Sequence, residues 1–159
     1  FWLVLDHDGT RLTAGPVEVL GPPGQPVPFQ LRPIRWPLVG LGTRPAGGPT
    51  LDLEVQGRVT GVLTAPDTVR ASLDVTRDVR LGGTTTGGGT LPVHARLGEP
   101  VTVGIPTPTG RSQVTAPGVE VDVNLPRGVT RTGAAWEVHY AEYFTGSALT
   151  LVLVTERVR

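Results

Sequence analysis

The sequence of 159 residues contains no cysteine and no methionine. Without thiols it has no disulfide, no thiolate nucleophile and no cysteine ligand for a metal. All 14 basic residues are arginine, which excludes a Schiff-base lysine and the phosphate-binding lysine of a P-loop. Because residue 1 is not methionine, we expect a matured chain or a fragment. The sequence favours an exported protein of the cell envelope or the extracellular space.

An excess of charge of either sign is also missing, because the 14 arginines are balanced by 14 acidic residues. Arginines and acids alternate within the same stretches, as between Arg70 and Arg80. Nucleic-acid binding draws on clustered positive charge, so we expect no nucleic-acid partner. No apolar run approaches the ~18 residues of a membrane-spanning helix, so we expect no membrane insertion.

The chain is rich in glycine (22) and proline (16), while 38% of its residues are hydrophobic. The hydrophobic content favours a folded core over a disordered polymer. In the stretch Asp67–Leu81, from Thr68 onward, apolar residues occupy odd positions and polar residues even ones, apart from Arg77. This period of two predicts a half-buried strand, with a bend, bulge or change of sheet near Arg77.

The same alternation recurs in short runs that are separated by glycine and proline. These runs are Val17–Val19, Leu51–Gln56, Val101–Ile105 and Val119–Leu125, and Phe1–Leu5 adds a short run that is apolar throughout. Many short alternating runs between turn signals predict an all-β fold. We expect an antiparallel β-sandwich, immunoglobulin-like (Ig-like) or jelly-roll-like, with long Gly/Pro-rich loops. We expect one domain over residues 1–159, with a possible subdivision near 82–89, where GGTTTGGG fits a flexible surface loop or linker.

Four of the eight aromatic residues fall between Trp136 and Phe144. The segment from Ala134 to Phe144 fits either a strand or a helix, and its all-β surroundings favour the strand. Its rings either fill the core or form an exposed cluster that stacks on a sugar or another small ligand. Trp136, Tyr140 and Tyr143 are therefore the candidate ligand-stacking residues. Phe29 and Trp36 lie in a proline-rich segment that we expect to be extended and to cover a sheet edge or dock on a neighbour.

The run from Ala148 to Val154 is apolar on both faces of a strand. Such a strand is covered on both sides, either inside its own domain or by another chain through strand addition. The candidate interface residues are Leu149, Leu151, Val152, Leu153 and Val154. The apolar run at Phe1–Leu5 has the same character.

Leu3–Thr10 reads LVLDHDGT, an apolar strand followed by Asp-x-Asp-Gly-Thr. These eight residues resemble the first motif of haloacid-dehalogenase-type phosphatases. The resemblance implies a phosphoryl-accepting nucleophile at Asp6, a general acid at Asp8 and Mg²⁺ between them. That family uses a parallel sheet with helical crossovers and a later basic residue that is usually lysine. Since this chain shows neither, the favoured interpretation is an Asp-Gly hairpin turn.

The three histidines, His7, His94 and His139, are isolated in sequence, and their spacing favours surface positions over a metal site. We therefore expect no cofactor and no catalytic activity. The leading hypothesis is a structural, assembly or protein-interaction module that associates with a protein partner or with itself through its apolar terminal strands. The alternative is a module that binds carbohydrate or another ligand through the cluster at residues 136–144.

Overall fold

The computed structural model describes residues 1–39, 47–116 and 125–157. It contains strands and one short helix, which confirms the all-β prediction. The elements are β1 (Trp2–His7), β2 (Thr10–Ala14), β3 (Val27–Gln30), β4 (Ile34–Val39), β5 (Gly47–Ala65), β6 (Thr68–Leu81), β7 (Gly83–Arg96), β8 (Pro100–Ile105), β9 (Arg111–Thr115), β10 (Val129–Thr132), β11 (Ala135–His139), α1 (Tyr140–Tyr143) and β12 (Ala148–Val154).

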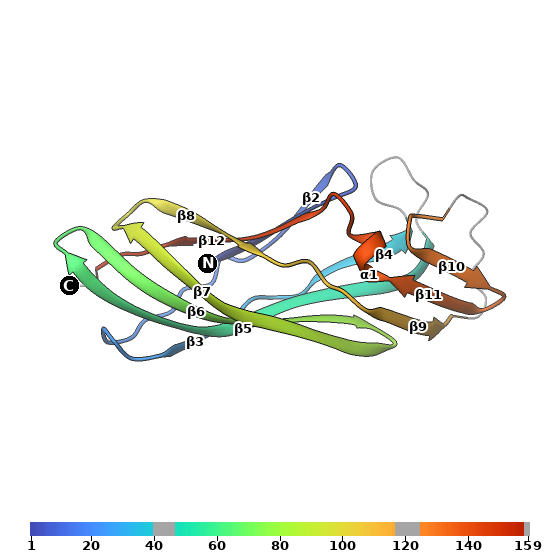
Figure 1. The fold of residues 1–159 in the computed structure, drawn as a ribbon, viewed down its shortest axis with the longest axis horizontal. Helices are drawn as coiled ribbons and strands as arrows, with labels where there is room; N and C mark the ends of the chain where they lie inside the picture. Colours follow the sequence, from blue (N-terminus) through green and yellow to red (C-terminus); the bar gives the residue numbers. More distant parts are fainter. Residues whose placement is uncertain (40–46, 117–124, 158–159) are drawn as a thin grey trace.

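The described strands form three antiparallel sheets. A five-stranded sheet has the order β3-β5-β6-β7, with β4 paired to β5 beside β3. A four-stranded sheet has the order β2-β1-β12-β8, and a three-stranded sheet has the order β10-β11-β9. Figure 1 shows the five-stranded sheet running along the molecule, with the four-stranded sheet over one part of it and the three-stranded sheet with α1 at the other end.

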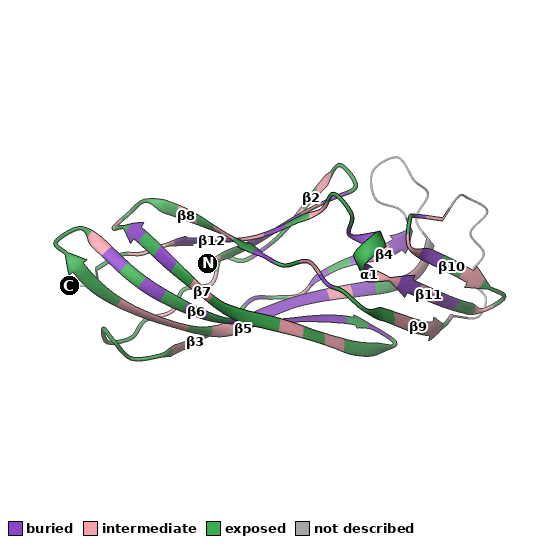
Figure 2. Cartoon of the chain, viewed as in Figure 1, coloured by how far each residue is buried: buried purple, intermediate pink, exposed green. Residues whose placement is uncertain are grey.

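β6 is the central strand of the five-stranded sheet, since it pairs with β5 on one side and with β7 on the other. Its odd residues are buried and most of its even ones are exposed or half-buried, as the sequence predicts. Figure 2 shows this alternation as bands along the strand. Full burial of a side chain such as Leu73 stabilises the fold by about 1.5–3 kcal/mol relative to exposure.

The prediction of a bulge or a change of sheet at Arg77 is wrong, because both ladders of β6 continue through this residue without a shift in register. The Arg77 side chain is buried on the apolar face and donates a hydrogen bond to the backbone oxygen of Pro106. Its cross-strand neighbour is Gly87, where a Cβ atom would collide with the guanidinium group. Because Gly87 has no side chain, the Arg77 side chain fits here without a break in the strand.

The prediction of a surface loop or linker at residues 82–89 is also wrong. Residues from Gly83 onward belong to β7 and pair with β6 in continuous register. Gly57 on β5 and Gly88 on β7 lie on the two sides of the middle of β6. A Cβ atom on Gly57 would overlap the carbonyl oxygen of Asp74, and a Cβ atom on Gly88 would overlap the carbonyl oxygen of Val75. Glycine within a strand often marks such a close approach of backbone.

The structure confirms some of the other predicted segments and corrects others. The extended segment around Phe29 and Trp36 forms β3 and β4, which cover one edge of β5. Residues 134–144 form strand β11 followed by the helical turn α1, so both readings of this segment apply in part. Val17–Val19 is not a strand but lies in the connection between β2 and β3. Most of the run Val119–Leu125 lies outside the described residues.

We predict that Gly57→Ala and Gly88→Ala each lower the free energy of unfolding by about 1–3 kcal/mol, because the added methyl group meets backbone rather than a movable side chain. Gly89→Ala is the matched control, since its Cβ atom would meet nothing within 4 Å. Urea unfolding followed by circular dichroism measures all three. Equal stability of Gly88→Ala and Gly89→Ala would contradict the tight approach at the middle of β6.

Candidate functional site

An apolar pocket of about 350 Å³ lies where three parts of the fold meet. These parts are the β5–β6 hairpin, the connection between β2 and β3, and the end of β12. Its lining includes Phe1, Val59, Val69 and Leu153. Leu153 and Val69 are buried, and Phe1 and Val59 are half-buried. Residues of the hydrophobic core therefore form part of the pocket lining.

Backbone hydrogen bonds hold the walls of this pocket in place. The N–H of Gly24 donates to the oxygen of Gly61 at 2.9 Å, which fixes the β2–β3 connection against β5. The N–H of Gly98 donates to the oxygen of Thr155 at 2.8 Å, which fixes the β7–β8 turn against the end of β12. The pocket is therefore formed by anchored segments before any molecule enters it.

The rim of the pocket exposes large apolar side chains. Leu20 is 74% exposed, Val62 41% and Leu63 42%. Of the four large hydrophobic side chains that are exposed among the described residues, only Trp2 lies outside this lining. The charged residues of the lining, Glu156 and Arg157, have opposite signs. Exposed apolar side chains gathered around one hollow are typical of interaction sites.

The structure separates the predicted interface residues of the last strand into residues buried in the core and residues that line the pocket. β12 pairs with β1 on one edge and with β8 on the other, so its backbone is fully used within the chain. Leu149 and Leu151 are buried in the core, and Val152 is half-buried on the opposite face. Leu153 and Val154 line the pocket described above. The end of β12 is therefore the part of this strand that belongs to the pocket.

The predicted ligand-stacking rings lie inside the core. Trp136 is 1% exposed, Tyr140 0% and Tyr143 4%. Arg131 covers the ring of Trp136, with its guanidinium carbon 4.9 Å from the ring centroid. The Tyr140 hydroxyl donates to Ser112 Oγ at 2.7 Å, and burial raises the pKa of this hydroxyl. In this conformation no face of the three rings is open to a sugar.

His7 is a buried residue, which corrects the expectation that it lies on the surface. It is 6% exposed and packs against the rings of Tyr143 and Phe144, with centroids 4.6 and 5.4 Å away. Its Nδ1 atom lies 2.6 Å from Ser147 Oγ. This contact joins the end of β1 to the start of β12, and we assign it a packing role. In residues 1–39, 47–116 and 125–157, no three His, Cys, Asp or Glu side chains are grouped as a metal site.

The motif that resembles a phosphatase forms a hairpin between β1 and β2. Asp8 and Gly9 have φ values of 51° and 77°, as the two-residue type I′ turn requires. Asp6 forms an exposed ion pair with Arg11 at 2.8 Å, and this hydrogen bond holds the pKa of the Asp6 carboxyl below its usual range. The antiparallel hairpin is the interpretation that the sequence favours, and it differs from the parallel strand that the phosphatase resemblance implies.

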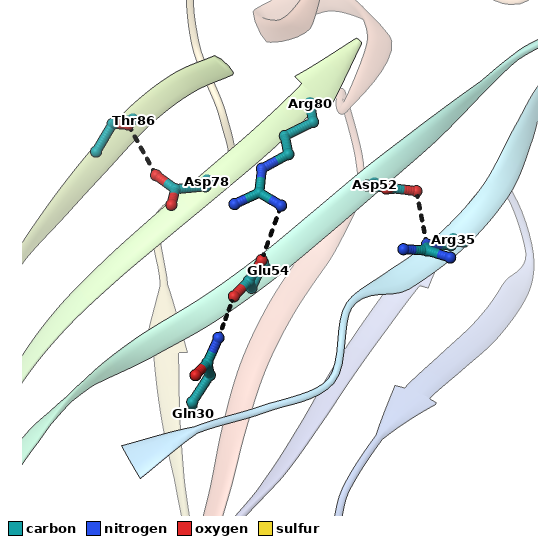
Figure 3. Close-up of polar contacts among 7 residues, drawn as sticks. All are labelled: Gln30, Arg35, Asp52, Glu54, Asp78, Arg80 and Thr86. Atoms are coloured by element: carbon teal, nitrogen blue, oxygen red, sulfur yellow. Dashed lines mark hydrogen bonds and ion pairs between the residues drawn. The ribbon is translucent and has the colours of Figure 1, made fainter. Parts of the chain in front are cut away.

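A polar network that the sequence analysis missed lies on the outer face of the five-stranded sheet (Figure 3). The buried carboxylate of Glu54 accepts a hydrogen bond from Gln30 at 2.6 Å and pairs with Arg80 at 3.3 Å. Asp78 accepts a hydrogen bond from Thr86 at 2.7 Å. The even positions of β5 and β6 carry this network. The strand alternation could have placed these residues on one face, but it could not have paired them.

We predict that Tyr143→Phe lowers the free energy of unfolding by about 1–3 kcal/mol, because it leaves two buried groups unpaired. The Trp36 indole N–H donates to the Tyr143 hydroxyl at 2.8 Å, and that hydroxyl donates to the Leu38 carbonyl at 3.3 Å. The control is Tyr140→Phe, which removes a hydroxyl whose partner, Ser112, is only half-buried. Urea unfolding should show the smaller loss for the control, and the reverse order would contradict this assignment.

We also predict that Leu151→Ala costs about 2–5 kcal/mol of unfolding free energy, because Leu151 is 0% exposed in a strand paired on both edges. Val152→Ala, one residue along and on the opposite face, should cost less than half as much. Thermal unfolding compares the two variants. A tolerant Leu151 would mean that β12 is not part of the core and is free to be donated to another chain.

Neither a family model, nor a curated protein, nor a solved structure matches this chain. Its function is therefore inferred from its own residues. Monomeric proteins rarely expose several large apolar side chains together, so the apolar pocket with its exposed rim is the main candidate site among these residues.

Proposed function

We propose that the chain is a non-catalytic protein-interaction module of structural or assembly type, and that an apolar segment of a partner protein docks in the pocket beside β12. The observation that carries this proposal is the gathering of Leu20, Val62 and Leu63 around one apolar hollow. Apolar anchors that fill a pocket and are sheltered by surrounding contacts supply most of the affinity in protein interfaces.

A protein partner fits this surface better than a small molecule does. The pocket volume of about 350 Å³ lies at the lower end of the ~300–1,000 Å³ typical of small-molecule sites. A small molecule that filled the hollow would still leave a side chain as exposed as Leu20 largely in water. A protein surface covers the hollow and the rim together. The opposite charges of Glu156 and Arg157 at the rim give no preference for a charged partner.

The proposal keeps part of the interface expected from the sequence, since Leu153 and Val154 of the last strand belong to the pocket. Leu149 and Leu151 are buried in the core and do not line the pocket. Among the described residues, no helix is long and apolar enough to cross a bilayer. Location at the cell envelope or outside the cell stays a prediction.

Selection from a library of random peptides displayed on phage tests the proposal. We expect selected peptides rich in Leu, Ile, Val and Phe, with binding measured by fluorescence anisotropy. Leu63→Glu should weaken this binding at least about tenfold, because it places a charge on the apolar rim. The control is Trp2→Glu, which makes the same change at an exposed apolar side chain outside the pocket.

Two results would overturn the proposal. One is the same affinity for a selected peptide in Leu63→Glu as in the unchanged protein. The other is failure to select any peptide while a small apolar molecule such as decanoic acid binds in the pocket. Chemical-shift changes on peptide binding should centre on Val59, Leu63 and Leu153.

A further inference from the structure

Among the described edge strands, β7 has the longest stretch without a charged residue or a proline. Natural proteins discourage pairing with another chain by placing charged residues or proline on edge strands. The edge strands carry Arg11 on β2, Pro28 on β3, Arg35 and Pro37 on β4, Pro100 on β8, Arg111 on β9 and Arg131 on β10. Residues Gly83–Leu91 of β7 contain neither a charged residue nor a proline.

The free edge of this stretch is open to solvent. β7 pairs with β6 on one side, and no strand within residues 1–39, 47–116 or 125–157 pairs with its other side. Thr84, Thr86, Gly88 and Thr90 are exposed. Figure 2 shows this part of β7 as mostly exposed, in contrast to the banded β6.

Pro92 identifies which backbone groups of β7 point outward. Proline has no N–H to donate, so within a sheet its nitrogen lies on the open side of an edge strand. In an antiparallel ladder alternate residues point their N–H and C=O groups to the same side. With Pro92 opposite Ser72, the groups of Thr84, Thr86, Gly88 and Thr90 therefore point away from β6.

We propose that β7 pairs with β7 of a second copy of this chain, antiparallel and around a two-fold axis at Gly87. This register places Thr84 opposite Thr90 of the second copy, and Thr86 opposite its Gly88. All four residues have outward N–H and C=O groups, so each donor finds an acceptor. Two-fold symmetry repeats every contact.

The side chains of the two strands are compatible in this register. Thr84 and Thr90 form a cross-strand pair of the kind that favours sheets, and no like charges face each other. The glycines leave a shallow hollow of about 400 Å³ on the face over β6 and β7, so no large side chain stands beside this part of the edge. Residues Gly83–Leu91 carry no charged side chain that would oppose the same stretch of a second copy.

The paired edge does not include the residues that line the apolar pocket. The dimer therefore goes beyond the proposed function and can be tested separately from it. A single strand edge is small beside the ~1,600 Å² of a standard stable interface, so we expect a dimer whose population depends on concentration.

Sedimentation equilibrium of the full chain over a range of concentrations tests the dimer. Gly89→Lys should weaken dimerisation at least about tenfold, because lysine on an edge opposes strand addition. Gly89 is exposed and a Cβ atom there would meet nothing within 4 Å, so the lysine side chain begins in open space. The matched control is Gly104→Lys, in equally open space on edge strand β8, which should dimerise as the unchanged chain does.

A second variant tests the same contact if Gly89→Lys does not fold. Thr84→Pro removes one outward N–H group from each copy, and the Thr84 side chain that it replaces is exposed. Circular dichroism confirms that each variant keeps its strands. A chain that stays monomeric at every concentration at which it remains in solution would overturn the proposal, as would equal weakening by Gly89→Lys and Gly104→Lys.

Amide hydrogen exchange followed by NMR locates the contact. With increasing protein concentration, exchange should slow at the N–H groups of Thr84, Thr86, Gly88 and Thr90. Their neighbours that already pair with β6 should change less. Slowing that falls instead on β2 or β8 would place the dimer contact on another edge and overturn the proposal.

Discussion

The burial of alternate side chains along β6, between two fully paired neighbours, is the constraint on which the other elements depend. Its odd residues form one wall of the hydrophobic core, from Val69 to Leu81. β1 and β12 bring Leu5 and Leu151 to the same core from the opposite layer. Because each strand exposes its other face, the polar network around Glu54 and the open edge of β7 follow from the same alternation.

Glycine makes this long ladder possible where a side chain would break it. Gly57 and Gly88 admit a close approach of backbone at the middle of β6, and Gly87 gives room to the buried Arg77. The glycines that serve the ladder also remove side chains from β7. The edge that results has no charge to repel another strand, and it is the edge on which we propose the dimer.

Alternation predicted β5, β6 and β8 because these strands are half-buried and their side chains change character at every residue. The Asp8–Gly9 turn was predictable because few residue pairs accept two positive φ values. The strand at Gly83–Gly89 was not, since glycine and threonine give no apolar period and this strand is defined by its pairing with β6. The burial of His7 was equally hidden, because the rings that enclose it lie far away in sequence.

The candidate site was only partly visible in the sequence for the same reason. Leu153 belongs to an apolar run in the sequence, but Leu20 lies in the connection between β2 and β3 and Leu63 lies near the end of β5, with no shared motif. Only the fold brings these three side chains to one hollow. An interaction surface made of single apolar residues from distant segments leaves no local pattern, whereas a catalytic motif often does.

The most direct test of this account is amide hydrogen exchange along β6 in the monomeric protein. A continuous central strand should protect the N–H groups from Val69 to Val79 to a similar extent, with no gap near Arg77. Fast exchange confined to Asp74–Asp78, between two protected halves, would mean that the ladder breaks at its middle, and it would contradict the arrangement from which the pocket and the edge of β7 are derived.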